Sequence, residues 1–351
     1  MHISKKKPSY AISNKLRSYL EKYDRETKLP VSYESLMHWK EGFPIMDKKG
    51  VDTLWESVMY EPSRMEELNE GLTQIYALLK TDGDISVMEH LRVDRIDFCH
   101  FGNSKPFRIR IINQFNDNYD YFYVKIADAS RVYGLEFEHI LSPNRINYIV
   151  DGNSLIEEHI AGIPGDQFVE QFLSLPNFSK VRLAKEFVKF NERCFVRLLG
   201  DMRSYNYVID ITPDFEEAQY RVRAIDFDQQ CYEGRKNVYL PQFFKENNAI
   251  VDFCLEIMTP ETVTQYQYEE RILIKKRYES AWYRTNDLLE AIKQDSISTP
   301  EKINQLKGEL NKYHKTKEFD NCKNMGEIMG VHLELMLTKP IPERKSSAFK
   351  L

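Results

Sequence analysis

Cysteine is scarce in this sequence, and no two cysteines lie close together. The 351 residues include five cysteines, an odd number, and none of them forms a C-x-x-C pair. This spacing argues against a disulfide framework and against a zinc site built on paired cysteines. We therefore expect reduced thiols in a cytoplasmic protein at all five positions: Cys99, Cys194, Cys231, Cys254 and Cys322.

Long apolar runs and several familiar catalytic motifs are also missing. No stretch approaches the length of a membrane-spanning helix, and the first residues lack the apolar centre of a signal peptide. The eight histidines include no H-E-x-x-H motif, and the G-x-S-x-G, Walker and G-x-G-x-x-G patterns are absent. These absences predict a protein without a membrane partner and argue against a zinc hydrolase.

A strong positive charge is absent as well. The net charge is -5 with an isoelectric point near 6, and the basic run at residues 5–7 is short and terminal. Nucleic-acid binding needs a clustered positive field, so we expect no nucleic-acid partner. What the sequence does contain is a hydrophobic content of 42%, which is ample for a packed core. The oligomeric state cannot be predicted from this composition.

From residue 11 to about residue 80 the sequence has a mostly helical pattern. Ser63 and Glu66 have the spacing of a capping box, and residues 81–84 (Thr-Asp-Gly-Asp) are typical of a helix end. Between them, four apolar residues fall on one helical face: Leu68, Leu72, Ile75 and Leu79. We therefore expect an extra helical segment over residues 1–90.

Residues 91–160 change to a β-rich pattern. Three stretches rich in β-branched and aromatic residues (92–101, 107–114 and 121–126) predict consecutive antiparallel strands. A short helix is expected over 132–141, followed by strands at 146–150 and 154–159 with a tight turn at 151–153. This region is predicted to be a small antiparallel domain.

Residues 161–351 are predicted to be mainly helical. An amphipathic helix spans residues 183–198, and a hairpin pairs 207–211 with 220–225. Helices are expected at 249–258 and across 266–289, with Thr259 as a cap before Pro260. A sheet followed by helices is the order of an α+β, two-lobed protein.

Three short segments carry the residues with chemical potential. Residues 200–206 (Gly-Asp-Met-Arg-Ser-Tyr-Asn) follow the amphipathic helix, residues 225–228 (Ile-Asp-Phe-Asp) end a strand, and Val124-Lys125 ends another. Phosphoryl transfer needs a carboxylate beside the acceptor hydroxyl, oxygen ligands for Mg²⁺ and a lysine for the phosphates. Their order and context favour a phosphotransferase.

On these motifs, residues 92–230 resemble the protein-kinase-like superfamily, nearest to its aminoglycoside-phosphotransferase-like branch of small-molecule kinases. Asp201 and Asn206 match the D-x-x-x-x-N catalytic loop, and Arg203 stands where many of these kinases place a basic residue facing the transferred phosphate. Asp226 matches the metal-binding aspartate. The resemblance implies a bilobal fold with a small antiparallel-sheet N-lobe and a mostly helical C-lobe, here residues 91–160 and 161–351.

The resemblance also implies a nucleotide site. Lys125 matches the lysine of the third strand, which a helix glutamate, Glu136 or Glu138, is expected to hold in place. The residue pattern does not choose between the two, although Glu136 leaves more apolar surface for packing. The loop Gly102-Asn103-Ser104 takes the place of a glycine-rich loop, and the backbone of Glu158, His159 and Ile160 is similar to a hinge that faces adenine.

The sequence departs from the family pattern in several places. Leu199 replaces the usual histidine before the catalytic aspartate, no glycine-rich loop is present, and the connection at 212–219 is longer than usual. A longer hairpin is expected to absorb that connection without moving either metal ligand.

The predicted function is a phosphotransferase that uses ATP and Mg²⁺ and acts on a hydroxyl-bearing acceptor, by analogy a small molecule. Under this hypothesis Asp201 and Arg203 are catalytic, and Asn206 and Asp226 bind Mg²⁺. Two alternatives stay open: a catalytically silent kinase-fold scaffold, and a protein kinase or nucleotidyl transferase that uses the same site.

Overall fold

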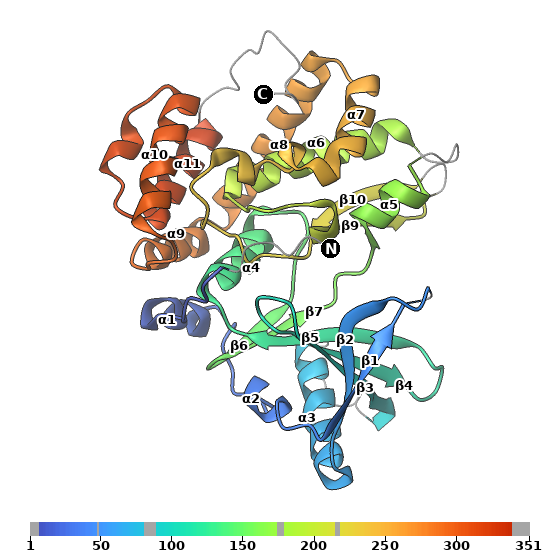
Figure 1. The fold of residues 1–351 in the computed structure, drawn as a ribbon. Helices are drawn as coiled ribbons and strands as arrows, with labels where there is room; N and C mark the ends of the chain where they lie inside the picture. Colours follow the sequence, from blue (N-terminus) through green and yellow to red (C-terminus); the bar gives the residue numbers. More distant parts are fainter. Residues whose placement is uncertain (1–6, 48, 81–88, 174–178, 215–217, 339–351) are drawn as a thin grey trace. The chain divides into compact units, whose positions relative to one another are not determined.

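The computed structural model describes residues 7–47, 49–80, 89–173, 179–214 and 218–338, and Figure 1 shows the chain. The chain divides into two compact units. The sheet unit comprises Met1–Ala129 and Ile146–His159, and the helical unit comprises Ser130–Arg145 and Ile160–Leu351. The order, an antiparallel sheet followed by a mostly helical part, confirms the α+β fold class.

The sheet unit is built on one seven-stranded antiparallel sheet in the order β1-β2-β3-β4-β5-β7-β6 (Figure 1). The five strands predicted from the sequence all form, each within about two residues of its expected ends. The strands are β1 (Glu41–Met46), β2 (Asp52–Met59), β3 (Leu91–Cys99), β4 (Phe107–Asn113), β5 (Tyr119–Ile126), β6 (Tyr148–Asp151) and β7 (Ser154–Glu158). A two-residue turn joins β6 to β7, and Gly152 there adopts a φ of +55°, which suits glycine.

Helix α3 (Pro62–Lys80) packs its apolar face on this sheet. All four residues of the predicted face are buried, and they join the strands in one core with Phe107, Phe122 and Val124. The helix begins at Pro62, so Ser63 lies inside its first turn and is not its cap. The predicted helix end at 81–84 lies outside the described residues. Among the residues described before α3, shorter helices form at α1 (Asn14–Lys22) and α2 (Tyr33–Leu36).

The prediction of a separate helical segment over residues 1–90 is wrong for residues 41–59. This stretch forms β1 and β2, and Trp55 of β2 pairs with Cys99 of β3. Most side chains of β1 are exposed, so the strand lacks the alternation of buried and exposed residues that predicts a strand. Residues 1–90 therefore belong to the sheet unit and are not a module of their own.

The helical unit begins with most of α4 (Ala129–Leu141) and is dominated by long helices (Figure 1). Its small sheet has the order β10-β9-β8. Its strands are β8 (Ile163–Pro164), β9 (Tyr207–Thr212) and β10 (Gln219–Ala224). Its other helices are α5 (Gly165–Gln171), α6 (Lys180–Arg197), α7 (Asn248–Ile257), α8 (Pro260–Ser280), α9 (Trp282–Ile292), α10 (Pro300–His314) and α11 (Met325–Thr338). Short 3₁₀ turns lie at Ser204–Asn206, Lys236–Tyr239, Pro241–Phe243, Lys245–Asn247 and Glu318–Asn321.

The predicted start of the helix at Pro260 and the predicted hairpin are both observed in this unit. Thr259 caps α8 by accepting a hydrogen bond from the Thr262 backbone, with Pro260 at the first helical position. Strands β9 and β10 pair without a break from Tyr207↔Ala224 to Thr212↔Gln219. The long connection therefore lies at the far end of the hairpin from residues 206 and 225.

Candidate active site

The loop after α6 is held in an unusual backbone conformation. Leu198 ends the helix in the left-handed region, with a φ of +52°, and Asp201 adopts a φ of +58°. A non-glycine residue with positive φ is uncommon, and such residues gather at functional sites. The Asp201 backbone nitrogen donates to the Val238 carbonyl at 3.1 Å, which fixes the loop against a neighbouring segment. Asp201 is thereby presented on a rigid loop.

The structure brings Asn206 and the β10 end together. The Ile225 backbone nitrogen donates to the Asn206 carbonyl at 3.0 Å, so Asp226 follows directly beside Asn206. The Asn206 amide nitrogen donates to the Asp201 carbonyl at 2.7 Å. Because the nitrogen is used in this way, the amide oxygen is the group of Asn206 that remains suited to a cation. The three predicted residues thus form one cluster within the helical unit.

Asp201 lies in a charged triad with Arg203 and Glu246. The Arg203 Nε donates to Asp201 Oδ1 at 2.8 Å, and its Nη1 donates to Glu246 Oε1 at 2.6 Å. Burial raises the pKa of the Asp201 carboxyl above its usual value, while Arg203 acts in the opposite direction. Arg203 is therefore beside Asp201, and a partner that the sequence did not predict, Glu246, holds it there.

A second unpredicted residue, Arg131 of α4, contacts the predicted metal ligand. Its Nη1 donates to Asp226 Oδ1 at 2.9 Å and to Asp228 Oδ1 at 2.8 Å. Helix α4 approaches this loop closely at Gly134, where a Cβ atom would lie 3.0 Å from the Cβ of Phe227. Phe227 is fully buried.

In the sheet unit, Lys125 is buried and ion-paired. Its Nζ lies 2.7 Å from Glu157 Oε2 and 5.2 Å from the centroid of the Tyr123 ring. The predicted loop Gly102-Asn103-Ser104 reaches the same end of β5, because the Ile126 backbone nitrogen donates to the Ser104 carbonyl at 3.3 Å. The loop and the lysine are therefore adjacent within this unit.

Of the predicted hinge, Glu158 and His159 belong to the sheet unit and Ile160 to the helical unit. The Glu158 nitrogen donates to the Asn147 carbonyl and the His159 nitrogen to the Tyr121 carbonyl, at 3.1 and 3.3 Å. These two backbone donors are thus used inside the protein. Burial lowers the pKa of the His159 imidazole.

The two candidate helix glutamates have partners in the helical unit. Glu136 lies 2.5 Å from Arg284 Nη2, and Glu138 is paired with Arg197. Both glutamates are buried. Burial opposes ionisation of Glu138, but Arg197 and Ser142 outweigh it and lower its pKa. The pairing of Lys125 with either glutamate stays a prediction.

Other kinds of site find no support in the described residues. Within that part of the chain, no three His, Cys, Asp or Glu side chains are grouped to hold a metal ion. The five cysteines are free and buried. Across the same residues, no helix combines the length and apolarity that crossing a membrane requires.

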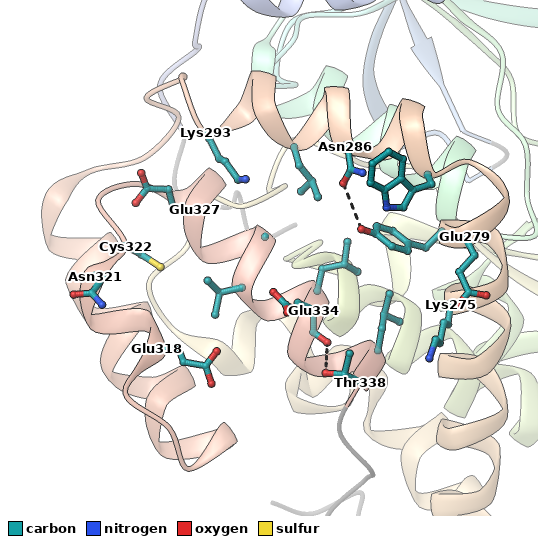
Figure 2. A pocket seen from close by; sticks show the side chains of 17 residues that line it. Lys275, Glu279, Asn286, Lys293, Glu318, Asn321, Cys322, Glu327, Glu334 and Thr338 are labelled. Carbon is teal, nitrogen blue, oxygen red and sulfur yellow. Dashed lines mark hydrogen bonds between the residues drawn. The ribbon is translucent and has the colours of Figure 1, made fainter.

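A groove of about 770 Å³ lies elsewhere in the helical unit, between α8, α9 and α11 (Figure 2). Its lining includes Trp282, Leu289 and Leu333 with several charged side chains, among them Lys275, Glu279 and Glu334. None of the predicted site residues lines it. We place the candidate chemistry at the aspartate cluster, because phosphoryl transfer needs hard oxygen ligands and a proton acceptor rather than volume alone.

Comparison with known proteins adds little. No protein-family model matches the chain, and none of the curated proteins matches it. A solved structure described as "Titin kinase and its flanking domains" is similar at a TM-score of 0.27 and 12% identity, over 74% of this chain. This chain spans 50% of the length of that one. So loose a superposition carries no weight, and the α+β assignment rests on the observed strands and helices.

Sequence reasoning missed Arg131 and Glu246 for different reasons. The helix that became α4 was expected to start at residue 132, one residue after Arg131, so this side chain was not placed on a helix face. Glu246 lies in a short 3₁₀ turn at Lys245–Asn247, where no motif is present. No local signal in the sequence marks Glu246 as a partner of Arg203, 43 residues earlier.

Proposed function

We propose that this protein is a protein-kinase-like phosphotransferase that uses ATP and Mg²⁺ to phosphorylate a hydroxyl-bearing acceptor. The observation that carries the proposal is the hydrogen bond from the Ile225 nitrogen to the Asn206 carbonyl. It joins the segment before Asp226 to Asn206, whose amide contacts the Asp201 backbone, and this supports a shared site for the two proposed metal ligands. Sequence positions 20 residues apart thus supply one cluster with the groups that phosphoryl transfer needs.

Asp201 is the proposed proton acceptor for the attacking hydroxyl. Its raised pKa brings the carboxylate closer to the range in which a general base works well at neutral pH. Arg203 is held at 2.8 Å from Asp201, where a cation can offset negative charge that develops on the transferred group. Glu246 limits the freedom of that arginine, so the charge is positioned before the substrate arrives.

Asn206 and Asp226 are the proposed Mg²⁺ ligands. An amide oxygen and a carboxylate are hard oxygen donors of the kind Mg²⁺ prefers, and the Asn206 amide is oriented by its bond to Asp201. These residues therefore fit the ion. Bound there, it would neutralise phosphate charge.

The proposed nucleotide-binding residues of the sheet unit are Lys125 and the adjacent loop at 102–104. The buried Lys125–Glu157 ion pair presents the ammonium group in a fixed position, which suits a phosphate-binding role. By analogy with small-molecule kinases, the acceptor is proposed to be a small molecule.

A catalytically silent scaffold is the second candidate function. It is favoured by the contact between Arg131 and Asp226, because that arginine gives the carboxylate a structural role that needs no metal. The two candidates differ in whether the protein binds Mg-ATP.

The test is the thermal midpoint of the native chain, of Asp226→Asn and of a control, Asp252→Asn, each with and without Mg-ATP. Asp252 is exposed on α7, outside the cluster. A ligand at 100 times its dissociation constant stabilises the native state by about 2.7 kcal/mol, so the native chain and the control are expected to show a clear rise. The thermal midpoint of Asp226→Asn is expected to rise little with Mg-ATP. No rise in the native chain at millimolar Mg-ATP would contradict the phosphotransferase and leave the scaffold.

A further inference from the structure

Arg131 is the feature of the cluster that the proposed phosphotransferase chemistry does not explain. One of its nitrogens, Nη1, lies within hydrogen-bonding distance of both Asp226 and Asp228, and its Nη2 lies 3.4 Å from the Ile225 carbonyl. The Arg131 side chain is 3% exposed, whereas that of Asp226 is 34% exposed. A buried cation therefore sits on the inner side of a carboxylate that still reaches solvent.

The position of Arg131 is fixed by the surrounding structure. The neighbouring Ser130 hydroxyl donates to the carbonyls of Asp228 and Gln230, at 3.1 and 2.7 Å. The guanidinium carbon lies 6.0 Å from the centroid of the Phe227 ring. The start of α4 is thus fastened to the loop after β10 by backbone contacts as well as by charge. Such a guanidinium is a permanent part of the cluster, not a mobile surface side chain.

The charges at this point have a direct consequence for metal binding. Two carboxylates that share one nitrogen would repel each other without a cation between them. Arg131 supplies that cation, so the pair is compensated in the absence of metal. A divalent ion that approaches Asp226 without nucleotide meets the summed charge of Arg131, Asp226 and Asp228, which is one negative charge. Without Arg131 it would meet two. Its attraction to the site is correspondingly weaker, and the difference is larger where solvent is excluded.

We propose that Arg131 is a resident counter-ion that suppresses divalent-cation binding at Asp226 in the absence of nucleotide. This inference rests on the proposed function, because the phosphates of the bound nucleotide would supply the negative charge that the ion needs at this site. Metal and nucleotide would then enter together. Arg131 is in this sense a positioning residue, because it acts on Asp226 and touches no substrate in the proposal.

The experiment measures binding of Mn²⁺ alone, by electron paramagnetic resonance of the free ion, to the native chain and to three variants. The native chain is expected to bind Mn²⁺ only at millimolar concentration. Arg131→Met removes the positive charge and is expected to bind Mn²⁺ at least tenfold more tightly. Arg131→Lys keeps the charge and is expected to remain as weak as the native chain.

The matched control is Arg284→Met. Arg284 also pairs with a buried glutamate of α4, Glu136, so its removal likewise leaves a carboxylate of this helix without a charged partner. This variant is expected to lose stability without gaining affinity for Mn²⁺. A gain as large as that of Arg131→Met would overturn the proposal, because it would trace the effect to general loosening of α4.

Thermal midpoints with Mn²⁺ give a second readout. Arg131→Met is expected to unfold at a lower temperature than the native chain, and millimolar Mn²⁺ is expected to raise its midpoint by more than it raises the native midpoint. If this variant folds only when Mn²⁺ is present, the same conclusion follows. Tight Mn²⁺ binding by the native chain, or no response in Arg131→Met, would refute the counter-ion role. Neither result depends on ATP, so failure here is distinguishable from failure of the phosphotransferase proposal.

Discussion

The interiors of the two units are stabilised in different ways. The core of the sheet unit is an apolar cluster of aliphatic and aromatic side chains from α3 and the strands. Charges are also buried here, as in the Lys125–Glu157 pair, but where this unit buries a carboxylate at Asp97, its partner Arg108 is still 25% exposed. In the helical unit, both members of several ion pairs are buried: Arg197 with Glu138, and Arg271 with Glu192.

This contrast teaches that the two interiors depend on different kinds of complementarity. An apolar core tolerates changes that conserve volume, because its contacts are non-directional. A buried ion pair depends on its partner, since removal of one member leaves a charge without compensation. We therefore expect the interior of the helical unit to be sensitive to charge changes, and the apolar cluster of the sheet unit to respond mainly to lost volume.

The largest effect is expected when the buried pair of the helical unit is broken. Arg197→Ala leaves Glu138 buried without its main partner, and we expect a loss of about 3–5 kcal/mol in the free energy of unfolding. The double variant Glu138→Leu, Arg197→Met removes both charges and is expected to recover most of that loss. Urea unfolding measures the free energy of unfolding of both variants. A loss below about 1 kcal/mol for Arg197→Ala would remove the contrast between the units.

The tryptophans allow the two units to be followed separately. Trp39 and Trp55 lie in the sheet unit, whereas Trp282 lies in the helical unit. Fluorescence of Trp282 in a chain with both other tryptophans replaced by phenylalanine reports on the helical unit. The complementary variant, Trp282→Phe, reports on the sheet unit.

A smaller effect is expected from a cavity in the sheet unit. Leu72 of α3 is fully buried in the apolar cluster. Leu72→Ala is expected to destabilise this unit by about 3 kcal/mol through lost burial and the remaining cavity. Urea unfolding at low and high salt checks the mechanism, because a cavity effect changes little with ionic strength. A strong salt dependence would show that charges also determine the stability of this core.

The smallest effect concerns pH and the histidine pair of the helical unit. His332 is fully buried between the Phe195 carbonyl, at 2.9 Å from Nε2, and His314, at 3.0 Å from Nδ1; Arg271 also faces it. Burial, with His314 second, holds its pKa well below the usual 6.5. The folded state therefore stays unprotonated where the unfolded state gains a proton. Stability is full above pH 6.5 and falls below it, by at most about 1.4 kcal/mol per pH unit.

Unfolding of the native chain and of His332→Gln, followed by Trp282 between pH 7.5 and 5.5, measures this linkage. Glutamine keeps a donor for the Phe195 carbonyl but does not titrate in this range. The free energy of unfolding of His332→Gln is expected to be lower than that of the native chain and to change less with pH. Equal slopes for the two chains would assign the pH dependence to other groups.

The sequence predicted those elements whose residues show a clear pattern. Helix α6 has a strong apolar periodicity, and β3, β4 and β5 are rich in β-branched and aromatic residues, so each was found. Strands β1 and β2 were missed; most side chains of β1 are exposed and give no such pattern, and β2 is largely half-buried without a regular alternation. In the candidate site, spacing and context suggested Asn206 and Asp226, whose segments adjoin through the Ile225–Asn206 hydrogen bond; their roles stay predictions. Arg131 and Glu246 were not, since a contact between distant residues leaves no local trace.

The positive φ of Asp201 decides how the proposed base should be replaced. At +58° most side chains with a Cβ atom incur a steric cost, and asparagine and glycine tolerate the conformation best. Asp201→Ala would remove the carboxylate and also disturb the loop that carries Asn206, so the two effects on activity could not be separated. Asp201→Asn removes the charge and keeps the backbone. Of these two substitutions, it is the one whose effect on activity would report on chemistry alone.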